Sequence, residues 1–140
     1  MAQVPSTVCP FSKSSMRQGD RARLLGAFGE DTACRYLQKK GYKLLARNFT
    51  CRMGEVDIIA QKGRFVVFAE VKLRKNANFG QAREFVTAAK QRRIITAAEM
   101  WLMQNKTELQ PRFDVIEVYA PEGLETKKPE IHHLEDAYQL

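Results

Sequence analysis

The sequence VVFAEVKLRK, residues 66–75, begins as an apolar β-strand and then alternates apolar side chains with charged ones. Successive side chains of a strand point to opposite faces, so Phe68, Glu70 and Lys72 are expected to share one face. Apolar residues continue the other face: Val67, Ala69 and Val71. The segment therefore predicts a strand with one face in a core and with a carboxylate and an amine on the other.

A second strand is predicted immediately before it, in GEVDIIA from Gly54, with Lys62-Gly63 as the turn between the two. Alternation gives this strand one face with Glu55, Asp57 and Ile59, and another with Val56, Ile58 and Ala60. A two-residue turn would place Asp57 opposite Phe68 and Glu55 opposite Glu70, whereas an unbulged three-residue loop would separate these groups. With the two-residue turn, three acids are expected on one face.

The rest of the chain predicts two helices and three further strands. Helix-favouring residues run from Gly19 to Lys40 with Gly41 as a C-cap, and from Thr87, a candidate N-cap, to about Gln104. Strand composition appears in YKLLARNF from Tyr42, in RFDVIEVYA, and in EIHHL as a short edge strand. The order αβββαβ(β) predicts a single α/β domain, borderline α+β, with a mixed central sheet flanked by helices. Residues 1–16 are interpreted as a mobile tail and 17–140 as the domain.

Composition favours a basic cytoplasmic protein without a membrane segment. The 140 residues carry a net charge of +7, and no apolar run is long enough to cross a bilayer. The N-terminus has no apolar signal-peptide core, and three widely spaced cysteines without a CxxC pair fit reduced thiols. Clustered cations suit phosphate contact and make a polyanion such as a nucleic acid a plausible partner: Arg74, Lys75, Lys90, Arg92 and Arg93. A solvated basic surface is the alternative.

Asp57 and Glu70 are the candidate metal ligands. Like charges across a strand ladder repel, and Mg²⁺ (or Mn²⁺) binds through one or two carboxylates together with water and substrate phosphate. Lys72, two residues after Glu70, would face the same site and orient water or stabilise phosphate charge. The alternative for a lone ExK motif is a solvated sheet face on which Lys72 pairs with a neighbouring acid.

Two helical residues add to this candidate site. Glu30 projects from a stripe of small and apolar residues, and Gln91 shares a helix face with Ile94 and Ile95, so its amide is expected to point toward the sheet. Taken singly, Glu30 also fits a partly exposed acid and Gln91 a first-turn residue. Adjacent His132 and His133 should point to opposite faces of a strand, so a shared metal is not expected.

Several longer stretches resemble the uncharacterised YraN family, UPF0102, from about Gly26 onward: GEDTACRYLQKKGYKLLARNF, CRMGEVDIIAQKGRFVVFAEVKLR, FGQAREFVTAAKQRRI and RFDVIEV. That family is similar to the PD-(D/E)xK, or restriction-endonuclease-like, nucleases and to archaeal Holliday-junction resolvases. The resemblance implies a restriction-endonuclease-like fold, a divalent metal and a DNA substrate, with branched or junction DNA as the narrower expectation.

Carried over by residue, the resemblance assigns the metal-binding acids to Asp57 and Glu70 and the lysine to Lys72. Glu30 matches the resolvase-like acid of the first helix, and Gln91 matches a helix-borne polar residue near such sites. The proline that names the motif is Val56 here. Where relatives often read VTPRKQRR, this chain has VTAAKQRR, a departure that touches phosphate contact and leaves the metal ligands in place.

Two functions compete at this point. The first is a Mg²⁺-dependent endonuclease that hydrolyses phosphodiesters; the second is a nucleic-acid-binding module that keeps the nuclease fold without its chemistry. Symmetric cutting of a four-way junction needs two active sites, so a homodimer is expected only under that narrower reading. Metal-independent, salt-sensitive binding that survives loss of Asp57 and Glu70 would favour the module.

Overall fold

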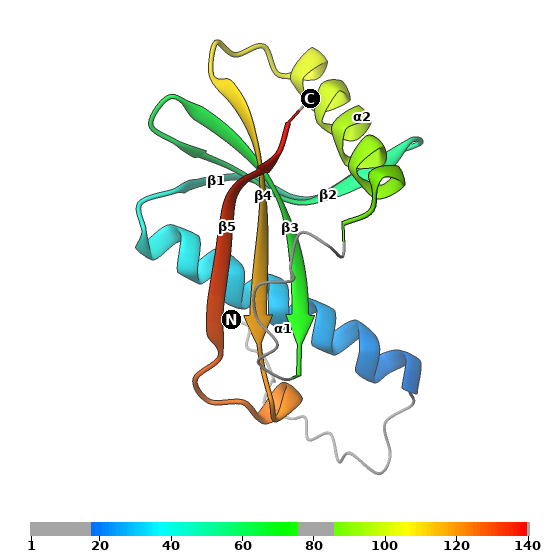
Figure 1. Cartoon of the computed structure of the whole chain (residues 1–140), viewed down its shortest axis with the longest axis vertical. Coiled ribbons are helices and arrows are strands. Elements are labelled where there is room, and N and C mark those ends of the chain that lie inside the picture. Colours follow the sequence, from blue (N-terminus) through cyan, green and yellow to red (C-terminus); the bar gives the residue numbers. More distant parts are fainter. Residues whose placement is uncertain (1–17, 76–85, 140) are drawn as a thin grey trace, which may run out of the picture.

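The computed structural model describes residues 18–75 and 86–139, and the predicted tail at 1–16 lies outside them. Two helices, five strands and one short 3-10 helix follow in this order: α1 (Gln18–Lys39), β1 (Lys43–Cys51), β2 (Gly54–Lys62), β3 (Phe65–Arg74), α2 (Ala88–Gln104), β4 (Gln110–Tyr119), η4 (Gly123–Glu125) and β5 (Glu130–Tyr138). The order αβββαββ confirms the predicted α/β domain (Figure 1). Neither described helix combines the length and apolar character needed to cross a bilayer.

The strands form one mixed sheet in the order β1-β2-β3-β4-β5, in which only β3 and β4 run parallel. The two helices lie on opposite faces of it. Figure 1 shows α1 running behind β3, β4 and β5. A core cluster that includes Ala33, Cys34 and Leu37 fills the α1 face, and another that includes Ile94, Ala97 and Trp101 fills the α2 face.

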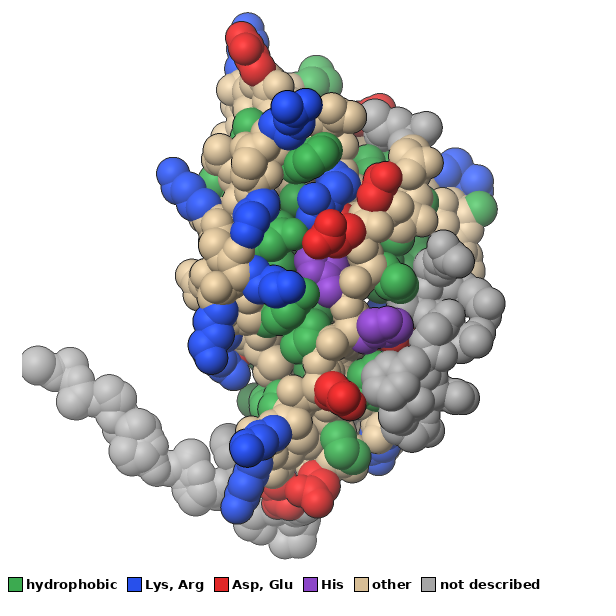
Figure 2. All heavy atoms as spheres, turned by 60° about the vertical axis from the view of Figure 1, so that its left-hand side comes forward, with side chains coloured by type: hydrophobic (Ala, Val, Ile, Leu, Met, Phe, Trp, Pro, Cys, Tyr) green, Lys and Arg blue, Asp and Glu red, His purple; other side chains and the backbone are tan. Residues whose placement is uncertain are grey.

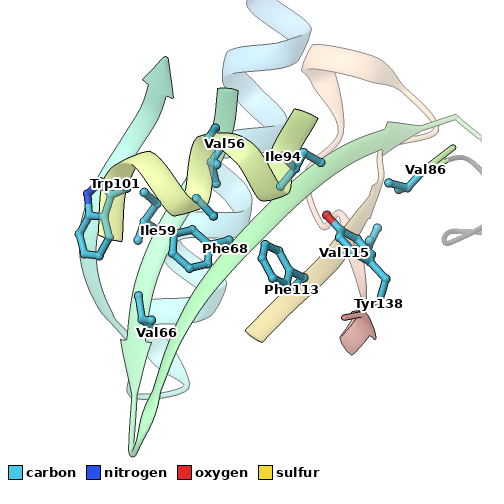
Figure 3. Close-up of a cluster of buried hydrophobic side chains, with 12 residues drawn as sticks. Val56, Ile59, Val66, Phe68, Val86, Ile94, Trp101, Phe113, Val115 and Tyr138 are labelled. Carbon is cyan, nitrogen blue, oxygen red and sulfur yellow. The ribbon is translucent and has the colours of Figure 1, made fainter. Parts of the chain in front are cut away.

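Strand β3 contributes to both clusters. Val67 and Ala69 belong to the α1 cluster, while Val66 and Phe68 belong to the α2 cluster. Figure 3 shows Phe68 between Ile59 and Phe113, and the Phe68 ring stacks on that of Phe113 at 5.5 Å. The prediction that Phe68, Glu70 and Lys72 share a face follows from this alternation, so the two charged residues belong to the α2 face.

The helix ends follow the predicted capping residues. Gly41 adopts φ +92°, a left-handed conformation that favours glycine, and the Tyr42 N–H donates to the Leu37 carbonyl at 2.9 Å. At the start of α2 the Thr87 hydroxyl accepts a 3.1 Å hydrogen bond from the Lys90 N–H. Both caps are confirmed.

The predicted pairing of β2 with β3 is wrong by two residues. Lys62 pairs with Phe65 and Ile59 with Phe68, so the turn is Gly63-Arg64, with Gly63 at φ +58°. A left-handed residue at the first turn position suits a tight hairpin, and only Gly63 adopts it without strain. Because side chains alternate with period two, the shift leaves every β3 side chain on its predicted face. Continued beyond the last pair, this register points Asp57 toward Glu70 instead of Phe68.

Alternation along β2 also fails at one point. Val56 packs in the α2 cluster together with Ile59, whereas Ile58 and Ala60 pack in the α1 cluster. Opposite this break, in β1, Asn48 has φ +52° and lies between the pairs Arg47–Ile58 and Phe49–Val56. Asparagine tolerates the left-handed region better than most residues. The prediction that Val56, Ile58 and Ala60 share a face is therefore wrong.

Strand β5 is longer than the predicted short edge strand. After a register shift next to Val115 it continues to Tyr138, which pairs with Phe113. Asp136, at φ +55°, lies within this irregular part. The extension carries Tyr138 into the α2 cluster.

Candidate functional site

Strands β2 and β3 part at Asp57 and Glu70. Their ladder ends with the pair Ile58–Ala69, whereas β3 remains paired with β4 as far as Arg74. Figure 1 shows β2 turning away from β3. At the point of separation the Val71 N–H donates a 2.9 Å hydrogen bond to Oδ2 of Asp57. We call this point, with the carboxylates of Asp57 and Glu70, the acidic fork.

The acidic fork concentrates negative charge in a partly dehydrated place. Burial raises the pKa of Asp57, and the negative charge of Glu70 raises it further, to about 7. Glu30 and Glu55 act in the same direction, while the Val71 N–H opposes them. Glu70 is itself buried, with 7% of its surface exposed. The two predicted ligands are therefore close enough to interact strongly, and a cation would relieve their repulsion.

Two lysines approach Glu70. The Nζ atom of Lys90 lies 2.7 Å from Oε2 of Glu70, and the Nζ atom of Lys72 lies 3.6 Å from the same oxygen. Burial lowers the pKa of Lys72, and the adjacent Lys90 ammonium adds to that effect. For Lys90, burial alone would lower the pKa, but the hydrogen bond to Glu70 outweighs it and the pKa is raised. Lys90 is thus the firmly protonated partner of Glu70.

An open cleft of about 510 Å³ adjoins the fork. Residues 50–55 at the β1–β2 turn form one wall, and Lys90, Arg93 and Ile94 of α2 form the other, with Glu70 between them. The two walls are in close contact at Gly54, where a Cβ atom would lie 2.4 Å from the Arg93 carbonyl oxygen. The cleft has room for a phosphodiester beside the acids.

Glu30 and Gln91 lie less directly at the fork. Glu30 extends from α1 and lies 3.5 Å from the Arg47 guanidinium, and its charge acts on Asp57. The Gln91 side-chain N–H donates to the Val86 carbonyl at 2.9 Å, which occupies the amide in the first turn of α2. Glu30 therefore shapes the electrostatics of the fork from the α1 side, while the Gln91 amide supports the helix start.

The predicted phosphate-binding cations divide into two groups. Lys90 and Arg93 line the cleft. Arg92 and Lys75 are exposed and lie outside its lining, and the Arg74 Nε atom lies 3.3 Å from the buried carboxylate of Glu117. The cleft thus combines two of the five cations with Glu70 of the fork.

Comparison with known proteins identifies the family of this chain. The model of the uncharacterised protein family UPF0102 matches residues 29–118. The chain belongs to this family. A UPF0102 protein of Geotalea daltonii is 45% identical over 119 residues, which cover 84% of this chain and 91% of the relative. One of Caldanaerobacter subterraneus subsp. tengcongensis is 43% identical over 118 residues, covering 83% and 95%. The segment matched to UPF0102 contains Asp57, Glu70, Lys72 and Lys90.

Tyr138 lies beyond the segment matched to UPF0102 and was missed in the sequence. It is buried at 8% exposure, and its ring stacks on Phe113 at 5.3 Å (Figure 3). Burial raises its pKa, and the charges of Glu70, Asp114 and Asp57 act in the same direction. Within the described residues its hydroxyl has no hydrogen-bond partner. No sequence signal marks it, since the irregular extension of β5 brings it there.

A second buried polar network lies on the α1 face of β4. Asp114 is fully buried and accepts hydrogen bonds from both Nε and Nη2 of Arg112, at 3.0 and 2.8 Å. The His133 Nε2 atom lies 2.7 Å from the same carboxylate, and the Tyr36 hydroxyl lies 2.9 Å from His133 Nδ1. His132 instead lies beside Glu117, so the two histidines part as predicted. The described residues contain no group of three His, Cys, Asp or Glu side chains that could hold a metal.

Proposed function

We propose that this protein is a divalent-metal-dependent endonuclease that acts on DNA, with Mg²⁺ or Mn²⁺ at the acidic fork. The observation that carries the proposal is the Asp57 carboxylate, which accepts a hydrogen bond from the Val71 N–H and whose pKa is raised by burial and by the charge of Glu70. Such a buried pair of acids is stable when charged only beside a cation. The resemblance to PD-(D/E)xK nucleases supports the same assignment.

The residues of the fork fit a Mg²⁺ ion. Mg²⁺ commonly takes one or two carboxylates and completes its shell with water and substrate phosphate, so a cage of three protein side chains is not required. Asp57 and Glu70 would supply these hard oxygen ligands, and Glu70 also lines the cleft of about 510 Å³. Burial and the negative charge of Glu70 destabilise the ionised Asp57 carboxylate, so a bound cation would be favourable there.

The chain's own residues have separate roles in this proposal. When bound, the divalent ion would act as the Lewis acid for phosphodiester hydrolysis. Lys72 lies 3.6 Å from Glu70, so its ammonium is placed to orient the attacking water or to stabilise charge on the phosphate. Lys90 and Arg93 would bind the phosphates, and Glu30 adds negative charge behind Asp57.

The narrower form of the proposal is action on branched or junction DNA in the cytoplasm. It rests on the similarity to archaeal resolvases, which is an analogy of fold. A homodimer would then bring two acidic forks to the two strands of one junction. The net charge of +7 supports a polyanionic substrate in either form.

The experiment is a cleavage assay on linear, flapped and four-way DNA with Mg²⁺, Mn²⁺ or EDTA. We expect metal-dependent products from the native chain and none from Asp57→Asn or Glu70→Gln. Glu122→Gln, at an exposed site in the turn before η4, is the matched control and should cut normally. Intact DNA with either metal across the pH range would overturn the proposal.

One observation favours the competing function, a non-catalytic DNA-binding module. Lys90 already lies 2.7 Å from Glu70 and neutralises part of the fork without a metal. A module of this kind would bind DNA in EDTA and keep its affinity in Asp57→Ala and Glu70→Ala. Its log affinity would still fall linearly as log salt concentration rises. Binding that requires Mg²⁺, or that is lost with these acids, would remove this alternative.

A further inference from the structure

A second pocket lies at the other end of β2. It encloses about 520 Å³ and is lined by Lys40 and Tyr42 after α1, by residues 62–65 of the β2–β3 turn, and by Arg112 and Glu135. Figure 2 brings this side of the molecule forward and shows Lys and Arg side chains gathered around exposed hydrophobic ones. We call it the basic pocket.

The basic pocket has an excess of unneutralised positive charge. Its lining holds four cations, Lys40, Lys62, Arg64 and Arg112, and one carboxylate, that of Glu135. Among the described residues only Arg112 of these four forms an ion pair, with Asp114 at 2.8 Å and with Glu135 at 3.9 Å. Within the described part of the chain, three cations therefore line the pocket without a carboxylate partner, which suits an anion better than a metal ion.

Aromatic rings lie beside three of these four cations. Lys40 lies over the Tyr36 ring at 5.5 Å, Lys62 over the Tyr42 ring at 5.1 Å, and Arg112 over the Phe65 ring at 5.1 Å. The Lys62 ammonium also donates to the Lys40 carbonyl. Rings position a cation without cancelling its charge, so the ammonium groups stay available to a ligand.

Arg112 forms a fixed wall of the basic pocket. Its side chain is only 10% exposed, and it donates to the Tyr42 hydroxyl at 2.8 Å as well as to Asp114. Asp114 is held in turn by His133 and by the Asp136 N–H, at 2.7 and 3.0 Å. Because the Arg112 guanidinium is already held on both sides, little further side-chain entropy is lost when a ligand binds it.

We propose that the basic pocket binds a phosphate group, separately from the acidic fork. Eight residue steps of β2 separate Gly54 at the cleft from Lys62 at the basic pocket, about 26 Å along an extended strand. The phosphate has two sources that the pocket cannot distinguish by charge: the backbone of a nucleic-acid strand, or a free phosphate or mononucleotide. The proposal does not depend on cleavage at the fork.

The test uses NMR amide shifts of the full chain in EDTA, which leaves the fork without metal. The probes are inorganic phosphate, a mononucleotide and a short single-stranded thymidine oligonucleotide. Saturable shifts at Gly41, Gly63 and Phe65 are expected with at least one probe. Tighter binding of the oligonucleotide identifies a strand as the source, and equal or tighter binding of the mononucleotide identifies a free ligand.

A pair of charge-matched variants tests the residues. Lys62→Glu/Arg64→Glu should weaken the binding on the order of tenfold and, for the oligonucleotide, flatten the salt dependence by about 0.7 for each phosphate that the variant no longer neutralises. The control variant Lys127→Glu/Lys128→Glu changes two exposed residues before β5 and alters the net charge equally. It should leave the affinity and its salt dependence unchanged. Lys62→Gln/Arg64→Gln replaces the first variant if it fails to fold. Shifts confined to the cleft, no saturable shift with any probe, or equal losses in the two charge-matched variants would overturn the proposal.

Discussion

The Asp57 carboxylate accepts a 2.9 Å hydrogen bond from the Val71 N–H at the point where β2 and β3 separate. A strand donor that has lost its ladder partner is thereby satisfied by a side chain, and the side chain is fixed in a partly buried position. The same position places the charge of Asp57 near that of Glu70. One position of the Asp57 side chain thus both satisfies the Val71 N–H and brings two carboxylates close together.

The first prediction concerns Asp57→Asn without metal. The folded pKa of Asp57 is raised from 3.8 to about 7, so its contribution to stability is fully present below pH 3.8 and is lost as pH rises through about 7. An asparagine keeps the acceptor for Val71 and avoids the buried charge. The free energy of unfolding should therefore rise by about 1–3 kcal/mol at pH 8, and hardly at pH 4, in urea titrations.

The control for this prediction is Glu122→Gln, which should show no such pH dependence. Adding Mg²⁺ should reduce the difference in free energy of unfolding between Asp57→Asn and the native chain at pH 8. An ion that binds the folded native chain stabilises it, and the variant has lost one ligand for that ion. An Asp57→Asn chain no more stable than the native one at pH 8 would show that this carboxylate is not strained.

The second prediction separates the two lysines near Glu70. Lys90→Met removes the charge-assisted hydrogen bond at 2.7 Å that competes with a cation, so Mg²⁺ affinity should rise about tenfold, equivalent to about 1.4 kcal/mol. DNA binding should weaken, because Lys90 lines the cleft. Titration calorimetry with Mg²⁺ measures the first effect and fluorescence anisotropy the second.

Lys72→Met is the matched variant. Its ammonium lies farther from Glu70, at 3.6 Å, so the gain in Mg²⁺ affinity should be smaller. Loss of the ammonium that orients water or stabilises phosphate charge should instead slow single-turnover cleavage by about a hundredfold or more. Equal effects of the two substitutions on metal affinity and on rate would contradict their separate roles.

The third prediction concerns the contact between the β1–β2 turn and α2. A Cβ at Gly54 would lie 2.4 Å from the Arg93 carbonyl oxygen, so Gly54→Ala must push the two walls of the cleft apart. We expect a loss of about 1–3 kcal/mol in the free energy of unfolding and reduced cleavage. Gly26→Ala is the control: its Cβ meets nothing within 4 Å inside α1, and it should stabilise by about 0.5–1 kcal/mol. Normal stability of Gly54→Ala would refute the close contact.

The sequence predicted the fold and the facing of β3 because these depend on local signals. Capping residues set the helix ends, and strict alternation set the faces of Phe68, Glu70 and Lys72. Periodicity does not specify pairing partners, so the predicted turn lies one residue before Gly63-Arg64 and the predicted pairing is wrong by two residues. Nor does periodicity predict that Val56 and Ile58 pack on opposite faces, a break that lies opposite the left-handed residue Asn48 of β1.

The candidate site was predicted less completely than the fold. Asp57 and Glu70 come from adjacent strands, so a local pattern could bring them together. Lys90 was noted only as a basic residue, since its contact with Glu70 depends on how α2 packs on the sheet. Tyr138 and the Asp114 network depend on β5, whose irregular register carries no periodic signal.

The last prediction tests the buried network behind the basic pocket. Burial raises the pKa of Asp114, but hydrogen bonds from His133, Arg112 and the Asp136 N–H outweigh it, so the pKa is lowered. Asp114→Asn leaves the Arg112 guanidinium buried without its carboxylate and should cost about 3–5 kcal/mol in the free energy of unfolding at neutral pH. Glu135→Gln removes the exposed partner of Arg112, 3.9 Å away, and should cost less than about 1 kcal/mol.

The cost of Asp114→Asn should also depend on pH. A lowered pKa gives stability above pH 3.8 that is lost at lower pH. The difference in free energy of unfolding between the native chain and Asp114→Asn, measured in urea titrations, should therefore shrink as the pH is lowered. A gap that is constant with pH would mean that the asparagine fails for its shape and not for its missing charge.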